Sequence, residues 1–181
     1  MNRRTNMNLI WYERQTVESG MHMRKRIIGA AGHAVAPRAQ SWLDVEQIAQ
    51  VEITSEDPSH PIESAVRPRG EPGWLAGGPG EQTIRLLFDQ PLRLKHIHLV
   101  FQEEQHARTQ EFALRWSLDG GQPNREIVRQ QYTFSPAGTT QEVEDYTVDL
   151  NGVTAIELQI IPDISGGAAL ASLAEWYMIA A

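Results

Sequence analysis

The sequence predicts an all-β protein, an antiparallel β-sandwich of the jelly-roll type, from three alternating runs. Between residues 81 and 121, apolar and polar side chains alternate along segments separated by polar or turn residues. The apolar positions are Ile84, Leu86 and Phe88, then Ile97, Leu99 and Phe101, then Phe112, Leu114, Trp116 and Leu118. Such alternation is typical of antiparallel strands that have one face on a core and the other in water.

Upstream of these runs, the sequence predicts a short helix, one strand and a long loop. A Ser-x-x-Asp capping box at residues 41–44 predicts a helix over 42–49, and alternation predicts a strand over 51–54. Residues 55–80 are rich in Pro and Gly and form the predicted loop, which also carries apolar anchors such as Trp74. Because structureless loops of this length are usually functional or disordered, and an aromatic anchor favours order, we expect a functional loop.

Downstream of residue 81, the sequence predicts turns that separate short strands. A turn at 89–91 divides the first two alternating runs, Asn151-Gly152 is the strongest two-residue hairpin signal in the chain, and residues 163–167 form a further turn. Strands are predicted at 126–130, 132–134, 142–150, 156–160 and 171–179. Many short strands at this spacing indicate a sandwich or jelly roll.

Residues 1–40 do not share this pattern. We expect them to form an irregular extension, poorly ordered or loosely docked, followed by one β-sandwich domain over residues 41–181. Arg24-Lys25-Arg26 precedes a short apolar segment that ends in Ala34-Val35-Ala36, which has the form of a signal cleavage site. The segment is short and contains Gly and His, so we expect no signal peptide, and a start at Met21 or Met23 stays open.

Length and composition limit the classes of function. A chain of 181 residues suits one domain with a sizeable core. Its formal net charge of -7 argues against a general nucleic-acid binder, because phosphate contacts need clustered Lys and Arg. The sequence has no cysteine and no apolar run long enough to span a membrane, which excludes thiolate chemistry and predicts no membrane partner. A soluble cytoplasmic protein is the expectation.

One pattern of metal ligands deserves comparison with an enzyme site. His96, His98 and Glu103 have the spacing of the metal site of cupins, which are also jelly rolls. Alternate residues of a strand point the same way, so both imidazoles face one side. That side lies opposite the apolar positions Ile97 and Leu99, the flanking glycines of the cupin motif are missing, and no histidine follows His106. Two solvent-facing histidines are therefore the simpler interpretation.

Other catalytic patterns are weaker. The chain has no G-x-S-x-G elbow for a nucleophilic serine and no phosphate-binding glycine loop followed by a helix and Lys. Carboxylates suited to glycoside hydrolysis are plentiful, but all lie in polar segments where solvated charge is the simpler role. These carboxylates are Glu103, Glu104, Asp119, Glu142, Glu144 and Asp145. The sequence therefore does not predict an enzyme.

Several segments resemble, in the same order, a known domain family. They are Ser55-Glu56-Asp57-Pro58, residues 61–65, the loop residue Trp74, Pro79-Gly80-Glu81-Gln82, Ser117-Leu118-Asp119-Gly120 and residues 171–175. Together they resemble the galactose-binding-like domains of discoidin and of the coagulation-factor C type, over about residues 41–179. The resemblance implies an eight-stranded antiparallel sandwich that binds ligands with loops at one end. Relatives bind sugars, glycans, lipid head groups or protein surfaces, and few are catalytic.

The resemblance also raises the question of a structural calcium site. Many relatives hold a structural calcium with carbonyls, an Asp of an Asp-Gly pair in the first long loop, and a Glu on the last strand. Glu175 matches that Glu, but Arg67-Pro68 stands where Asp-Gly is often found. Calcium needs several oxygen ligands, so we predict no calcium and no other cofactor, with Arg67 paired with a carboxylate such as Glu175.

Candidate ligand-binding residues lie in two loops. Trp74, among small residues, either offers its indole to a sugar ring or plugs the end of the sandwich. Arg108, flanked by Glu104 and Glu111, either holds a ligand hydroxyl or carboxylate or forms an intramolecular ion pair that fixes its loop. The predicted ligand-binding residues are Trp74, Arg67, Glu104, His106 and Arg108.

Taken together, these patterns favour a non-catalytic binding module, with carbohydrate as the ligand class on the strength of the family resemblance alone. A protein-interaction or assembly domain with the same fold is the alternative, and a cupin-like metal-dependent enzyme is the third. The identity of the ligand and the oligomeric state stay open, because fold does not fix function.

Overall fold

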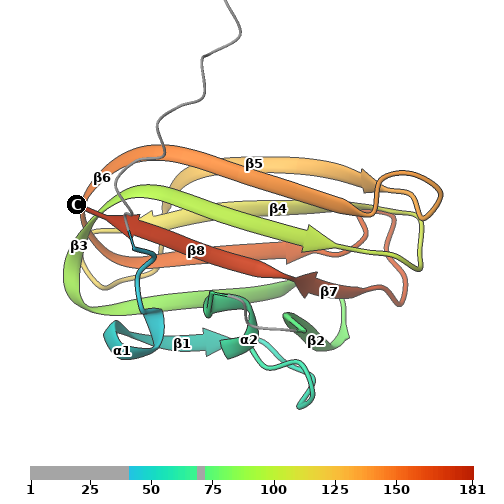
Figure 1. Ribbon diagram of the computed structural model, residues 1–181, viewed down its shortest axis with the longest axis horizontal. Coiled ribbons are helices and arrows are strands. Elements are labelled where there is room, and N and C mark those ends of the chain that lie inside the picture. The colour runs from blue at the N-terminus through green and yellow to red at the C-terminus, as the bar shows by residue number, and fades with distance from the viewer. Residues whose placement is uncertain (1–40, 69–71) are drawn as a thin grey trace, which may run out of the picture. The chain divides into compact units, whose positions relative to one another are not determined.

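The computed structural model describes residues 41–68 and 72–181, so the predictions for residues 1–40 lie outside the described residues. The elements follow one another along the chain as in Figure 1. They are α1 (Val45–Ile48), β1 (Ala49–Ile53), α2 (Glu63–Val66), β2 (Trp74–Pro79), β3 (Gln82–Gln102), β4 (Arg108–Ser117), β5 (Arg125–Phe134), β6 (Gln141–Ile161), β7 (Leu170–Leu173) and β8 (Glu175–Ala180). No helix in the described ranges is long and apolar enough to cross a membrane.

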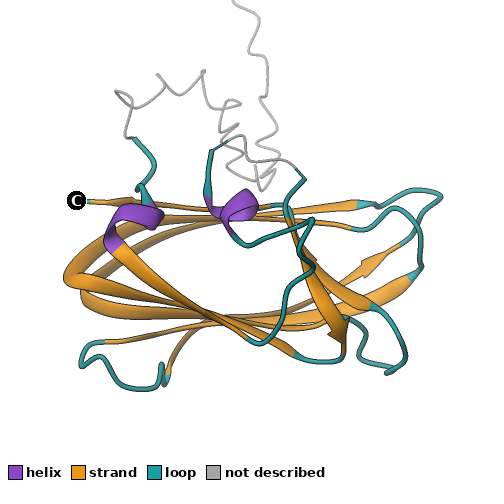
Figure 2. Cartoon of the chain, turned by 90° about the horizontal axis from the view of Figure 1, so that it is seen from below, coloured by secondary structure: helices purple, strands orange, loops and turns teal. Residues whose placement is uncertain are grey.

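Two long strands, β3 and β6, build the sandwich. They pair antiparallel from Gln82↔Ile160 to Gln102↔Gln141 and bend together near the middle, so each strand contributes to both layers (Figure 2). One layer has the order β1-β3-β6-β4-β5, and β8 pairs with the second half of β3 in the other layer. Strands β2 and β7 form a small separate sheet. The predicted antiparallel jelly-roll sandwich is confirmed.

The turn predicted at 89–91 and the hairpin predicted at residues 151–152 are wrong. Both segments are bends inside continuous strands, and the ladder between β3 and β6 shifts register there and resumes at Leu92↔Val153. Gly152 has a φ of 71°, which residues with a side chain rarely adopt. The local turn signal is thus used to bend a paired strand rather than to reverse it.

The predicted helix over 42–49 is also shorter than expected. Within this range only the four residues of α1 are helical. Asp44 makes no side-chain capping bond, and Ala49 already begins β1. The backbone N–H of Leu43 donates to the carbonyl of Met178 at 2.8 Å, which ties residue 43 to β8. A tertiary hydrogen bond therefore overrides the local helix signal.

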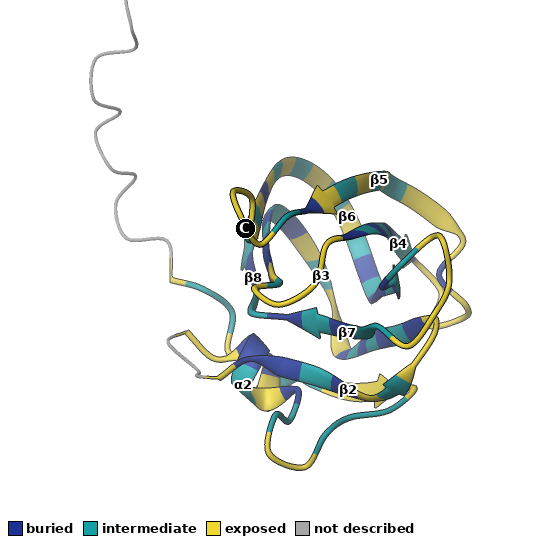
Figure 3. Ribbon diagram, turned by 90° about the vertical axis from the view of Figure 1, so that its right-hand side faces the viewer, coloured by how far each residue is buried: buried dark blue, intermediate teal, exposed yellow. Residues whose placement is uncertain are grey.

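The core follows the alternation in the sequence. The apolar positions of the alternating runs are buried in the core from Ile84 to Leu114, whereas Trp116 is partly buried and Leu118 is 41% exposed. Phe101 and Phe112 pack in the core at a tilt, with ring centroids 4.9 Å apart. Trp74 and Trp176 are the largest fully buried side chains among the described residues. The connections that follow β3 and β6 leave the sandwich at the end opposite the two bends (Figure 1), and Figure 3 looks onto that end.

Candidate functional site

A hollow of about 710 Å³ lies at this loop end of the sandwich. Residues 102–108 line one side, and Asp163 with residues 166–170 line the other. Leu75 of β2 and Ser172 of β7 complete the lining. Its size falls in the range of small-molecule sites, which combine an apolar surface with a few convergent polar groups.

Glu103 organises the first of these two loops. Its Oε1 accepts hydrogen bonds from the backbone N–H groups of Gln105 (2.8 Å) and His106 (3.0 Å), and its Oε2 accepts one from Arg108 Nε (2.9 Å). Burial raises the pKa of Glu103, but these hydrogen bonds and the charge of Arg108 outweigh it and hold the pKa below its usual value. Glu103 therefore stays ionised at neutral pH as the anchor of the loop.

Arg108 links the first loop to the second. Its side chain is only 1% exposed, its Nη1 donates to Gln110 Oε1 (3.1 Å) and to the carbonyl of Pro162, and its guanidinium lies 5.2 Å from the centroid of the Phe134 ring. Its Nη2 is buried without a hydrogen-bond partner among the described residues. The Glu103–Arg108 pair thus fixes both walls of the hollow before any ligand binds.

The second loop has its own turn. Asp163 Oδ1 accepts hydrogen bonds from the backbone N–H (2.9 Å) and hydroxyl (2.7 Å) of Ser165, and Gly166 and Gly167 adopt φ angles of 83° and 112°. The Ser165 bonds hold the pKa of Asp163 below its usual value. The backbone N–H of Ile164 donates to the Thr109 carbonyl at 2.9 Å, which ties this loop to β4.

A second hollow, of about 420 Å³, adjoins the first. The two share Ala107, Arg108 and Asp163 as a partition, and Thr109, Thr133 and residues 164–165 line the far side of the second. The loop end therefore offers two adjoining depressions on either side of one buried arginine.

The comparisons with known proteins concern the fold. No protein-family model and no curated protein matches the chain, but solved structures match most of its length. The CBM32 of AlyQ, in complex with 4,5-unsaturated mannuronic acid, has a TM-score of 0.55 and 17% identity and covers 77% of this chain and 98% of that chain. The C-terminal domain of a chitobiase from Bacteroides fragilis has a TM-score of 0.57 and 16% identity, and the match covers 78% of this chain and 98% of that chain. The family 32 carbohydrate-binding module of Clostridium perfringens NanJ, in complex with galactose, has a TM-score of 0.51 and 15% identity. That match covers 76% of this chain and 96% of that chain. The chain has the galactose-binding-like fold.

Three of the predicted ligand-binding residues meet at the hollow of this galactose-binding-like sandwich. Glu104 and His106 lie on its rim, and the His106 side chain is 74% exposed. Arg108 lies at its base, in the intramolecular ion pair that was the alternative to a ligand contact. Its partner is Glu103, not Glu104 or Glu111, which flank it in the predicted pattern.

The other two predicted residues lie elsewhere. Trp74 is 2% exposed, belongs to the hydrophobic core and pairs with Leu173 of β7, so it presents no ring face to a ligand and matches the alternative of a plug. Arg67 is exposed and forms an ion pair with Glu46 of α1 at 2.6 Å. Neither lines the hollow, whereas Asp163 and residues 166–170, for which the sequence predicted only a turn at 163–167, line one side of it.

The residues at the calcium position of the family pattern do not fit calcium. Arg67 points to Glu46 rather than to the predicted partner Glu175, and its carbonyl accepts a hydrogen bond from the Tyr177 hydroxyl at 3.1 Å. Glu175 lies 3.4 Å from His98 Nε2. Calcium needs several oxygen ligands around one point, and within residues 41–68 and 72–181 no group of three or more acidic or histidine side chains is placed to hold a metal ion.

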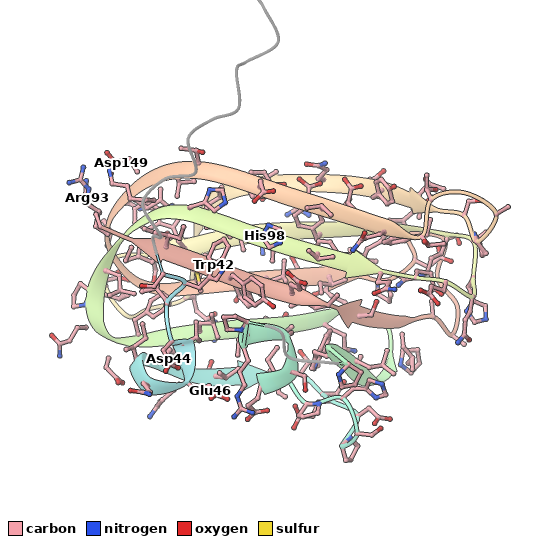
Figure 4. The ribbon with its side chains drawn as sticks, in the orientation of Figure 1. Trp42, Asp44, Glu46, Arg93, His98 and Asp149 are labelled. Atoms are coloured by element: carbon pink, nitrogen blue, oxygen red, sulfur yellow. The ribbon has the colours of Figure 1, made fainter. Side chains whose placement is uncertain are left out.

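The three residues of the cupin-like pattern do not meet at one point either. His96 Nε2 and His98 Nδ1 both contact Asp145 Oδ1, at 2.9 and 2.8 Å, while Glu103 is bound to Arg108. Burial raises the pKa of Asp145, but its hydrogen bonds to the two imidazoles lower it below the usual value. The Trp42 ring lies beside both imidazoles, with His98 shown next to it in Figure 4. This cluster is a surface contact that fastens residue 42 to the sheet.

Glu144 corrects the expectation that the carboxylates are solvated. It is 7% exposed and accepts hydrogen bonds from Gln130 Nε2 (2.6 Å) and from the Tyr146 hydroxyl (2.5 Å). Its neighbour Glu142 is a direct hydrogen-bond partner, and burial together with this contact raises the pKa of Glu142 to about 7. Two carboxyl groups in direct contact leave no room for a glycosidic bond between them, so the pair is not arranged as in a glycosidase.

This pair predicts a loss of stability as pH rises. The folded state holds the Glu142 proton up to about pH 7, whereas the unfolded chain releases it near pH 4.5, so the folded state binds more protons between these values. The stabilisation is complete below pH 4.5 and is lost as pH rises through 7, an effect of about 1–3 kcal/mol. Urea unfolding of the wild type should show this decline, and Glu142→Gln should remove it.

The matched control is Glu63→Gln, which changes an exposed carboxylate of α2. It should keep the wild-type dependence of the unfolding free energy on pH. If the unfolding free energies of the wild type and of Glu142→Gln change equally with pH, the folded state does not hold the Glu142 proton up to pH 7.

Proposed function

We propose that this chain is a non-catalytic carbohydrate-binding module whose loop-end hollow takes the sugar. The observation that carries the proposal is the preformed hollow itself, whose two walls are tied together by Glu103 and Arg108. Because the walls are fixed in advance, a ligand does not have to order them on binding, and less affinity is lost.

The lining suits a sugar. Aliphatic side chains of Leu75, Leu170 and residues 168–169 provide an apolar surface for the C–H face of a sugar ring, while Glu104, Gln105 and Asp163 offer hydrogen-bonding groups for hydroxyls. Two solved structures that share the fold are complexes with sugars, a mannuronic acid derivative and galactose. The fold likeness and the lining support the same ligand class.

The carboxylates support binding rather than catalysis. A glycosidase needs one protonated and one ionised carboxyl group on either side of the scissile bond. Glu103 and Asp163 both have a pKa below the usual value, which keeps them ionised and unsuited to donate a proton. Glu142, whose pKa is raised to about 7, does not line the hollow.

A substitution that fills the hollow tests the proposal. Ala107 is exposed and lines both depressions, so Ala107→Trp places a large ring across the opening without touching the core. We expect a glycan array to give a ligand for the wild type and titration calorimetry to show at least a tenfold loss of affinity in the variant. The midpoint of thermal unfolding should stay unchanged.

The matched control adds the same ring elsewhere. Val143 is 50% exposed on β6, and Val143→Trp should keep wild-type affinity for the same glycan. If Ala107→Trp binds as the wild type does, the sugar site lies outside the hollow.

A further inference from the structure

The charged side chains around the hollow fall into a compensated pair and an uncompensated pair. Glu103 and Arg108 neutralise one another at 2.9 Å. Glu104 and Asp163 line the same hollow, and neither has a cationic partner within ion-pair distance in the described part of the chain. Their hydrogen bonds come from neutral groups, Gln102 for Glu104 and Ser165 for Asp163.

The charge of Arg108 acts on Asp163, but its guanidinium is already paired with Glu103, so three carboxylates in the lining share one arginine. His106 is the remaining ionisable side chain in the lining, and it lies 3.8 Å from Glu103 rather than in an ion pair with Glu104 or Asp163. The whole chain also carries a formal net charge of -7. The hollow therefore has a negative potential, with carboxylate oxygens that accept hydrogen bonds.

One donor in the lining is unused. The Arg108 side chain is 1% exposed and lies at the partition of the two depressions, and its Nη2 has no hydrogen-bond partner among the described residues. A buried donor in this state indicates a missing acceptor, such as water or a ligand oxygen. Because Glu103 already neutralises the guanidinium charge, the donor does not need an anion, and a neutral hydroxyl oxygen can satisfy it.

We propose that the hollow selects neutral and amino sugars and rejects uronic acids. This selection rests on the proposed function and assigns its substrate class. Sugar hydroxyls or the ammonium group of an amino sugar donate to Glu104 and Asp163, and a hydroxyl oxygen accepts from Arg108. A uronate brings a further carboxylate near two that have no ion-pair partner in the described part of the chain, and like charges repel.

The test compares matched oligosaccharides by titration calorimetry with the full chain. Oligomers of galactose are compared with oligomers of galacturonic acid, and oligomers of N-acetylglucosamine with those of glucosamine, at low and high salt. We expect the uronate oligomer to bind at least about tenfold more weakly than its neutral counterpart, and the amino sugar to bind at least as well as the acetylated one. High salt should narrow both differences, because it screens exposed charges.

Removing the two charges should remove the selectivity. In the double variant Glu104→Gln and Asp163→Asn, the ratio of neutral to uronate affinity should fall towards one, while Glu63→Gln on α2 should leave it unchanged. Equal or tighter binding of uronates by the wild type would overturn the selection and leave the carbohydrate site standing. If none of these oligomers nor any glycan on an array binds, the proposed function itself fails.

Discussion

Replacing Trp74 with alanine should lower the free energy of unfolding by about 3–5 kcal/mol, as truncation of a large core aromatic does. Trp74 is 2% exposed, is among the largest buried side chains, and begins the strand that pairs with β7. Its loss leaves a cavity beneath one wall of the hollow, next to Leu75. Urea unfolding followed by circular dichroism measures the change.

Trp42→Ala is the matched control for the loss of an indole. Trp42 is partly exposed and packs on His98 and Tyr177 outside the core, so its removal should cost less than half as much. If Trp74→Ala unfolds like the wild type but loses sugar affinity, Trp74 contributes to ligand binding and not to the stability of the core.

Replacing Arg108 with methionine should cost about 3 kcal/mol of stability and weaken sugar binding. The change removes the bond to Glu103 and the donors to Gln110 and Pro162, and leaves a carboxylate, 14% exposed, without its cation. Stranding one partner of a buried ion pair is strongly destabilising. Chemical unfolding and calorimetry on the same preparation measure both effects.

A double-mutant cycle separates the pair from the rest of the site. Arg108→Met combined with Glu103→Gln should cost less than the sum of the single changes, because the second change removes the stranded charge. Arg67→Met breaks the exposed ion pair with Glu46 and should leave stability within experimental error. Additive single changes would mean that Glu103 and Arg108 do not act as a unit.

The sequence predicted the sheet faces better than the path of the chain. Alternation in the sequence reflects which side chains face water, so it correctly predicted most of the buried positions of β3 and β4. The turn signals at 89–91 and 151–152 marked real bends, but a bend and a reversal use the same residues. The choice between them came from the partner strand, because β3 and β6 stay paired on both sides of the bend.

The sequence predicted one of the two loops of the candidate site and missed the other, for a similar reason. Polar residues in the 102–110 segment pointed to Glu104, His106 and Arg108, yet three acidic residues lay near Arg108 and nothing local distinguished the one it binds. The opposite wall, Asp163 and residues 166–170, is rich in small residues and was predicted only as a turn at 163–167. The pairing of β3 and β4 with β6, and of β2 with β7, brings that segment beside the first loop.

The most direct test of the carbohydrate site is an amide NMR titration of the full chain with a neutral oligosaccharide that the glycan array identifies. The hollow predicts saturable shifts at residues 103–107 and 163–170, and no comparable shifts at Trp42 or along β8. Saturable shifts confined to Trp42 and β8, or none at any residue, would contradict it.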